Sequence, residues 1–187
     1  MPTITTNDLK NGMTLELDRD LVQVIEFQHV KPGKGHAFVR TTLRNVRTGA
    51  VVDRTFRAGE KVERAMIDKR SMQFLYRDGA DYVFMDSESF EQLVVPPDTL
   101  GEAANYVVEQ SEALMLMFGT EIVGVELSAA VELKITETEP GVQGDRVSGG
   151  RKPATLETGF VVQVPLFIEP GEHIKVDTRT GEYLSRV

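Results

Sequence analysis

The chain has 187 residues, of which 41% are hydrophobic, and a formal net charge of −8. This hydrophobic content is enough for a folded core and argues against a wholly disordered chain. The sequence contains no cysteine, which excludes disulfides, thiolate zinc sites and a cysteine nucleophile. The sequence shows neither a signal peptide nor the roughly 20 apolar residues that a membrane helix needs. We therefore expect a cytoplasmic protein with no membrane partner.

Charge is distributed unevenly along the chain. Residues 1–64 carry eleven Lys and Arg against eight Asp and Glu, whereas residues 65–187 carry ten against twenty-one. No acidic residue occurs between Phe27 and Val52. A basic end on an acidic body is expected to touch phosphates with that end only, although chance clustering in a small domain is the alternative.

The first 64 residues predict a small β domain. Two runs rich in β-branched and apolar residues, Leu21–Val30 and Ala37–Leu43, flank the segment Lys31-Pro32-Gly33-Lys34-Gly35-His36. Apolar runs joined by a short glycine-containing segment indicate a hairpin. Val51–Phe56 is predicted to form a further, half-buried strand.

Residues 65–128 predict a second β unit. The turn signal Asp78-Gly79 predicts a hairpin, and the expected strands are Met72–Tyr76, Tyr82–Asp86, Phe90–Val95, Leu114–Phe118 and Ile122–Leu127. After Pro96-Pro97, the apolar stripe from Leu100 to Val108 predicts one short helix. Asp98 or Thr99 is expected to cap that helix, with Glu102 completing a capping box from Thr99.

Residues 129–187 predict a third β unit. The expected strands are Val131–Thr136, Phe160–Ile168, Ile174–Val176 and Tyr183–Leu184, with a glycine-rich loop over residues 140–150. The predicted fold class is therefore all-β, with three small β-barrel-like modules in a row that each close to protect their strand edges.

The usual signatures of catalysis are missing from the sequence. Gly33-Lys34 is followed by glycine and a strand, so it does not match a phosphate-binding loop. His29 and His36 could approach each other across the predicted loop, but no acidic residue between Phe27 and Val52 completes a metal site. We expect no enzyme activity, no metal and no catalytic residue.

Two basic features deserve a functional hypothesis. Lys34 stands between two glycines at the apex of the predicted hairpin, where its ammonium group is free to project. Arg146, Arg151 and Lys152 gather in or beside the glycine-rich loop of an otherwise acidic module. The alternatives are a solubilising turn lysine and an ordinary surface loop.

The segment from Lys152 to Gly171 resembles the signature of the bacterial elongation factor P family. The matching positions are Lys152, Ala154, Gly159, Val164, Pro165 and Gly171. Lys31–Gly35 is similar to the N-terminal loop of that family, and residues 174–187 are similar to its C-terminus. The resemblance implies an SH3-like domain over residues 1–64 and two OB-folds over residues 65–128 and 129–187. It also implies an elongated, L-shaped outline like that of tRNA.

The same resemblance implies a function in translation. Members bind the 70S ribosome between its exit and peptidyl sites and stimulate peptide-bond formation, which relieves stalling at consecutive prolines by positioning peptidyl-tRNA. They act as monomers without a cofactor and are not enzymes. Lys34 is implied to reach the acceptor end of peptidyl-tRNA, supported by the tip loop of Lys31, Pro32, Gly33, Gly35 and His36. In some members this lysine receives a β-lysyl modification from a separate enzyme.

The third module is implied to carry further contacts. Gly144, Asp145 and Arg146 match a loop that approaches the mRNA at the exit site, although threonine is expected in place of Arg146. Tyr183 and Arg186 match C-terminal residues placed near the small ribosomal subunit. Two alternatives stay open: a paralogue of the family with different client proteins, and a free single-stranded RNA-binding protein that uses its OB-folds. The acidic modules and the lack of tryptophan disfavour the second alternative.

Overall fold

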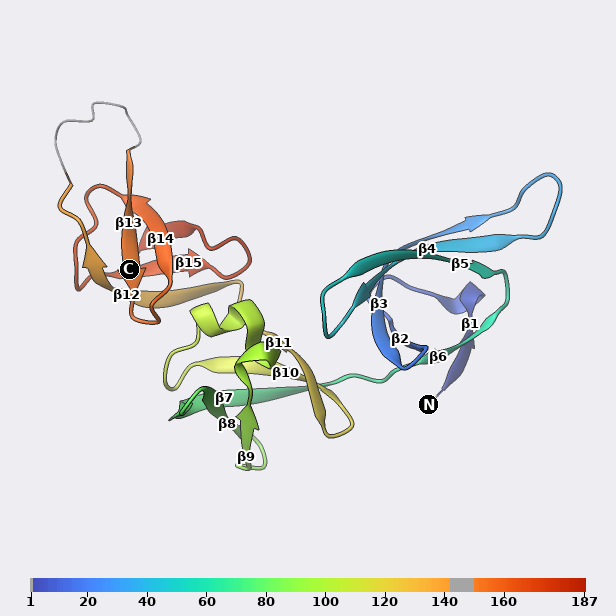
Figure 1. The fold of residues 1–187 in the computed structure, drawn as a ribbon, viewed down its shortest axis with the longest axis horizontal. Helices are drawn as coiled ribbons and strands as arrows, with labels where there is room; N and C mark the ends of the chain where they lie inside the picture. Colours follow the sequence, from blue (N-terminus) through green and yellow to red (C-terminus); the bar gives the residue numbers. More distant parts are fainter. Residues whose placement is uncertain (1, 142–149) are drawn as a thin grey trace. The chain divides into compact units, whose positions relative to one another are not determined.

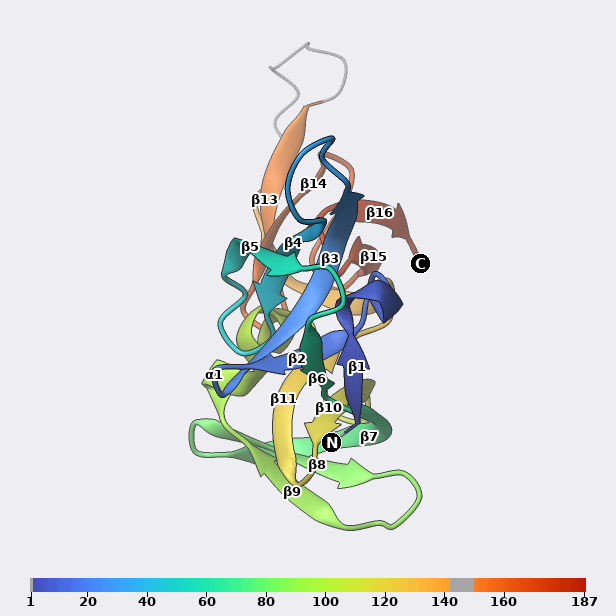
Figure 2. The same cartoon turned by 90° about the vertical axis from the view of Figure 1, so that its right-hand side faces the viewer.

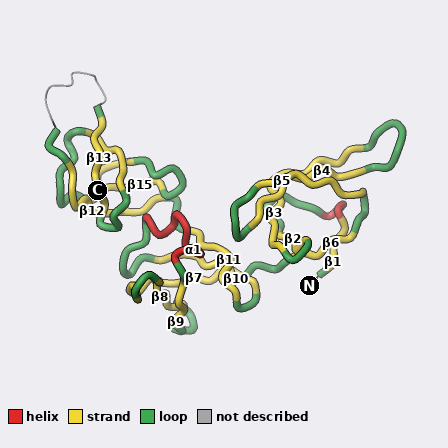
Figure 3. Tube along the Cα trace, in the orientation of Figure 1, coloured by secondary structure: helices red, strands yellow, loops and turns green. Residues whose placement is uncertain are grey.

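Strands make up most of the computed structural model, which describes residues 2–141 and 150–187 (Figure 1). The strands form three sheets. The helical segments within the described ranges are short: η1 (Thr6–Asp8), α1 (Pro97–Leu100) and η2 (Gly101–Asn105) (Figure 3). None of these helices is long and apolar enough to span a membrane. The all-β prediction is confirmed.

The first sheet has the strand order β1-β6-β2-β3-β4-β5. Its strands are β1 (Thr3–Thr5), β2 (Thr14–Leu17), β3 (Asp20–Val30), β4 (Phe38–Asn45), β5 (Val51–Arg57) and β6 (Lys61–Arg64). In β4, Val39, Thr41 and Leu43 are buried while Arg40 and Arg44 are exposed, which is the period of two that one buried sheet face requires. The sequence predicted β3, β4 and β5 but not β1, β2 or β6.

The second sheet has the order β11-β10-β7-β8-β9. Its strands are β7 (Asp68–Asp78), β8 (Asp81–Asp86), β9 (Gln92–Val95), β10 (Glu112–Phe118) and β11 (Glu121–Glu126). The predicted hairpin at Asp78-Gly79 is confirmed, with Gly79 at φ +63°.

Two details of this region differ from the prediction. Phe90 lies in a turn at φ +60° rather than in β9, because the Asp86 carboxylate accepts the N–H groups of Glu88 and Ser89 and closes that turn. The helix is capped by Pro96 without a side-chain hydrogen bond, so the Thr99–Glu102 capping box does not form. Proline presets the φ angle of a first helical turn, and Gly101 at φ +55° ends α1 after four residues.

The third sheet has the order β14-β13-β12-β15-β16. Its strands are β12 (Ala130–Thr138), β13 (Arg151–Leu156), β14 (Val161–Pro165), β15 (His173–Asp177) and β16 (Tyr183–Arg186). The predicted strand Phe160–Ile168 is shorter than expected, since β14 ends at Pro165, and β13 was not predicted.

The chain divides into two compact units. The first comprises residues 1–69 and 116–124, and the second comprises residues 70–115 and 125–187. In the first unit, Val123 shares a buried cluster with Leu21 and Ala65. The Arg47 guanidinium also donates two hydrogen bonds to the Glu121 carboxylate at 2.9 and 3.0 Å, and this lowers the pKa of Glu121. Apolar contact and a bidentate ion pair therefore attach part of the β10–β11 hairpin to the first sheet.

In the second unit, Tyr106 joins the segment after η2 to the third sheet. Its side chain is 6% exposed and packs in one core with Leu133, Ile135 and Val164. Its ring meets that of Phe160 edge-on, with the centroids 5.4 Å apart. The Thr158 hydroxyl donates to the Asn105 carbonyl at 2.7 Å. Tyr106 therefore belongs physically to the third module.

We predict that Tyr106→Ala lowers the free energy of unfolding by about 3 kcal/mol, because it removes a buried aromatic ring from this core. Tyr106→Phe is the matched control and should cost less than about 1 kcal/mol, since no hydrogen bond of its hydroxyl is seen within residues 2–141 and 150–187. Urea unfolding followed by circular dichroism measures both. Equal losses in the two variants would contradict the packing role.

Candidate functional site

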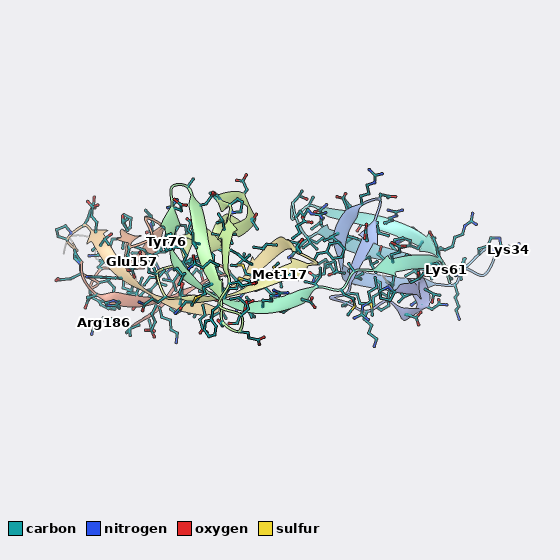
Figure 4. All side chains as sticks on the ribbon, turned by 90° about the horizontal axis from the view of Figure 1, so that it is seen from below. Lys34, Lys61, Tyr76, Met117, Glu157 and Arg186 are labelled. Atoms are coloured by element: carbon teal, nitrogen blue, oxygen red, sulfur yellow. The ribbon has the colours of Figure 1, made fainter. Side chains whose placement is uncertain are left out.

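Lys34 lies at the end of the hairpin formed by β3 and β4 (Figure 4). The last strand pair is Val30 with Phe38, so residues 31–37 form the connecting loop. Every residue from Lys31 to His36 is exposed. None of these six residues has a hydrogen bond or ion pair with another described part of the chain. The Lys34 ammonium is therefore available to an external partner.

The two glycines beside Lys34 have different roles. Gly35 has φ +107°, a conformation that side chains with a Cβ rarely adopt, so glycine is required there for the turn. Gly33 has no positive φ, and a Cβ added to it would meet no atom within 4 Å. The backbone conformation therefore does not require glycine at position 33, and the effect of Gly33 is to keep the surroundings of Lys34 free of a side chain.

The hairpin is anchored below the loop. Val39 and Phe56, which pair across β4 and β5, are 0% and 3% exposed. The Ala58 N–H donates to the Ala37 carbonyl at 3.0 Å, so the β5 side supports the chain up to the base of the loop. On the β3 side, the rings of Phe27 and His29 meet edge-on at 5.6 Å. Residues 31–36 are thus held only through the paired strands at their two ends, and β3, β4 and β5 lie side by side in Figure 2.

Free cations accompany Lys34 along the hairpin. Arg40 lies opposite Gln28 and Thr55, and Arg57 lies opposite Phe38 at the base of the loop. Both are exposed, and neither forms an ion pair with the described residues. By contrast, Arg47 is bound to Glu121 and Arg54 to Asp18. Lys34, Arg40 and Arg57 therefore place unneutralised positive charge at and beside the loop, and Arg44, which is also exposed and without an ion pair among the described residues, adds charge at the other end of β4.

This arrangement can bind a phosphate or another anion. Arginine and lysine donate charge-assisted hydrogen bonds to phosphate oxygens. Within the described ranges, no group of three His, Cys, Asp or Glu residues is arranged to hold a metal ion. His29 contacts Phe27, and His36 lies in the exposed loop.

The other predicted contact residues belong to the second unit or lie outside the described residues. Arg186 in β16 donates to the Glu172 carboxylate at 3.2 Å, and its guanidinium carbon lies 5.8 Å from the centroid of the Phe167 ring. Its side chain is nevertheless 56% exposed. Tyr183 packs against the core of the third module, so only part of its surface is accessible. Gly144, Asp145 and Arg146 lie outside the described residues.

Comparison with known proteins assigns all three sheets to one family. The family model described as Elongation factor P (EF-P) KOW-like domain matches residues 5–62. The Elongation factor P (EF-P) OB domain matches residues 67–125, and the Elongation factor P C-terminal model matches residues 131–186. The chain belongs to the elongation factor P family. The predicted SH3-like and OB-fold classes agree with these matches.

Relatives and solved structures agree with this assignment. The chain is 64% identical to elongation factor P of Acidothermus cellulolyticus over 97% of both chains. It is 56% identical to elongation factor P of Moorella thermoacetica, covering 98% of this chain and 99% of the relative. The fold is similar to that of translation initiation factor 5A from Methanococcus jannaschii, with a TM-score of 0.55 and 23% identity. That similarity covers 68% of this chain and 92% of the other.

Sequence reasoning missed Arg57 as a member of the basic hairpin. It follows directly after the predicted strand Val51–Phe56, and only the register of β5 places it beside the loop. Extending that strand by one residue would have included Arg57 in it, but would not have placed it beside the loop.

We predict that Gly35→Ala lowers the free energy of unfolding by about 1 kcal/mol, since the loop must strain or rearrange to accept a Cβ at a positive φ. Gly33→Ala, the matched control two residues away, should change it by less than about 0.5 kcal/mol. Thermal and urea unfolding of both variants measure the difference. Identical values would show that the observed φ of Gly35 does not constrain the loop.

Proposed function

We propose that the chain stimulates peptide-bond formation on the bacterial ribosome and relieves stalling at consecutive prolines. In this proposal it binds as a monomer between the exit and peptidyl sites, and Lys34 contacts the acceptor end of peptidyl-tRNA. Membership of the elongation factor P family supports a role in translation elongation. The observation that carries the finer proposal is an exposed Lys34 at the end of a supported hairpin, where neither it nor the cations beside it have an ion pair among the described residues.

The proposed mechanism is positioning. Peptide-bond formation depends on holding two substrates in a reactive arrangement. The ring of proline fixes its φ angle, which limits how a prolyl substrate can orient. A cation that binds the phosphates or sugar oxygens of the acceptor end restricts the motion of peptidyl-tRNA before the reaction. Less entropy then has to be lost when the reactive arrangement forms. This contribution requires no bond between the factor and the substrate, so the proposed role is not that of an enzyme.

Lys34 is also the proposed site of modification. Its ammonium is exposed and the flanking glycines leave room around it, so a modifying enzyme can reach it. A β-lysyl group would lengthen the reach of the side chain and keep a positive charge. Arg40 and Arg57 are proposed to steer the tRNA backbone toward the loop, because unpaired surface cations attract phosphate over about 8 Å at physiological ionic strength.

Binding of free RNA is the competing function. The second unit carries nine Lys and Arg against nineteen Asp and Glu, which disfavours a general RNA-binding surface there. Co-sedimentation with ribosomes and with naked RNA distinguishes the two. Tight binding to RNA combined with no binding to ribosomes would refute the proposal.

We predict that Lys34→Ala loses most of its stimulation of a reporter with three consecutive prolines in reconstituted translation. A reporter without prolines should change little. The free energy of unfolding should change by less than about 0.5 kcal/mol, because the side chain is exposed and forms no hydrogen bond or ion pair with the described residues. Lys34→Arg keeps the charge but changes the shape and blocks lysine modification, so it should restore activity only in part.

The matched control is Lys10→Ala, which removes another exposed lysine from the same unit. It should retain stimulation on the proline reporter. Full activity of Lys34→Ala, or an equal loss in Lys10→Ala, would show that Lys34 does not act at the reacting centre.

For the third module, we predict that Arg186→Ala weakens ribosome binding and makes that binding less dependent on salt, as expected when a phosphate contact is removed. Arg179→Ala is the control, since Arg179 is also an exposed arginine of this module that contacts an acidic residue, Asp177. Sedimentation over a salt titration measures both. If the two variants bind alike, Arg186 has no specific contact.

A further inference from the structure

A cleft of about 610 Å³ opens in the second unit, away from the Lys34 loop in the sequence. Its walls come from β7 and β8, from the segment that follows η2, and from the turn between β13 and β14. This volume falls within the range of roughly 300–1,000 Å³ that small-ligand sites occupy. The proposed role in translation uses no residue of this cleft.

Aromatic rings form one wall. Phe74 and Tyr82 pack with their centroids 5.5 Å apart, and both are buried. The guanidinium of Arg77 lies 4.6 Å from the centroid of the Tyr82 ring. Tyr76, also on this wall, is 47% exposed and has no cation over its ring among the described residues. One guanidinium, that of Arg77, thus already packs on an aromatic ring of this wall. The ring of Tyr76 remains available for a cation from another molecule.

Carboxylates form the opposing polar part of the cleft. Glu109 is exposed and has no hydrogen bond or ion pair with the part of the chain that the structure describes. The Glu157 Oε1 accepts the backbone N–H of Lys134 at 2.8 Å, and its Oε2 forms no hydrogen bond or ion pair with the residues that the structure describes. Tyr76 and Glu157 lie near each other in Figure 4, and both line the cleft. Arg77 forms an ion pair with neither carboxylate and instead donates to the Ala80 carbonyl at 3.3 Å.

We propose that this cleft binds an arginine or lysine side chain presented by a basic segment of another protein. The charged head would lie between Glu109 and Glu157 and over the ring of Tyr76. The aliphatic stem would lie along Val107 and Val108, which give the cleft its apolar side. The surrounding unit, with ten more acidic than basic residues, attracts cationic segments and repels nucleic-acid phosphates.

The test uses the full chain at low ionic strength and a blocked peptide, Gly-Arg-Gly-Arg-Gly. Binding is followed through the methyl NMR signals of Ala104, Val107 and Val108. Glu109→Gln combined with Glu157→Gln should weaken binding at least about tenfold, since two charge-assisted contacts are lost. Glutamine at 157 keeps an oxygen for the Lys134 N–H, so the turn should remain folded. Tyr76→Ala should weaken binding about threefold and Tyr76→Phe hardly at all.

The matched control removes two carboxylates elsewhere in the same unit, through Glu132→Gln and Glu137→Gln on β12. It should weaken binding less than about twofold, because neither of these side chains lines the cleft. Absence of peptide binding, or equal losses in both double variants, would overturn the proposal. If spermidine shifts the same methyl signals equally, the cleft binds free polyamines. If a short RNA shifts them, the cleft binds nucleic acid. Either result would contradict the proposal that a protein segment occupies the cleft. None of these measurements involves the ribosome, so they test the cleft independently of the proposed function.

Discussion

The pairing of β4 with both β3 and β5 is the constraint on which the presentation of Lys34 depends. β4 is hydrogen-bonded on both edges as far as Phe38, and alternate residues such as Val39 are buried in the hydrophobic core of the first sheet. The bulge between Val24 and Glu26 bends β3 on its way to the loop. A lysine on a long mobile loop would lose backbone freedom on binding, at a cost of roughly 1–2 kcal/mol for each residue that becomes ordered. Here the strands are already ordered, so that cost falls only on the residues of the tip.

Local charge, rather than the net charge of −8, decides what this hairpin can bind. Exposed ion pairs contribute only about 0–1 kcal/mol to stability. The main consequence of the pairs Arg47–Glu121 and Arg54–Asp18 is therefore that these two arginines are neutralised and less available to an external anion. They engage two arginines near or within the acid-free stretch and leave Lys34 and Arg40 without a partner among the described residues. An anion that binds to Lys34 or Arg40 therefore does not have to displace a carboxylate of the described chain.

The sequence predicted those parts of the fold that local patterns control. The hairpins at Lys31–His36 and Asp78-Gly79 carry their turn residues within the loop itself, and both were found. Phe90 was wrongly placed in a strand because an aromatic residue favours strands, whereas a side chain four residues earlier, Asp86, fixes the turn. Hydrophobic periodicity could not predict the role of Tyr106 either. This residue packs in the core of the third module, whose other core residues come much later in the sequence. The exposure of Lys34 could be predicted, but the neighbouring Arg57 depended on strand register.

The residues that made the family resemblance specific are largely structural. Lys152 is 6% exposed, and its ammonium donates to the Glu139 carbonyl at 2.6 Å, so this charge is held inside the third module. Ala154 and Val164 are 1% and 0% exposed in the same core. A buried ammonium is costly unless its hydrogen bonds are made, which ties Lys152 to the backbone across the base of the β12–β13 connection. The segment that identifies the family therefore specifies how one module packs, whereas the proposed chemistry depends on a short exposed loop whose sequence alone is far less distinctive.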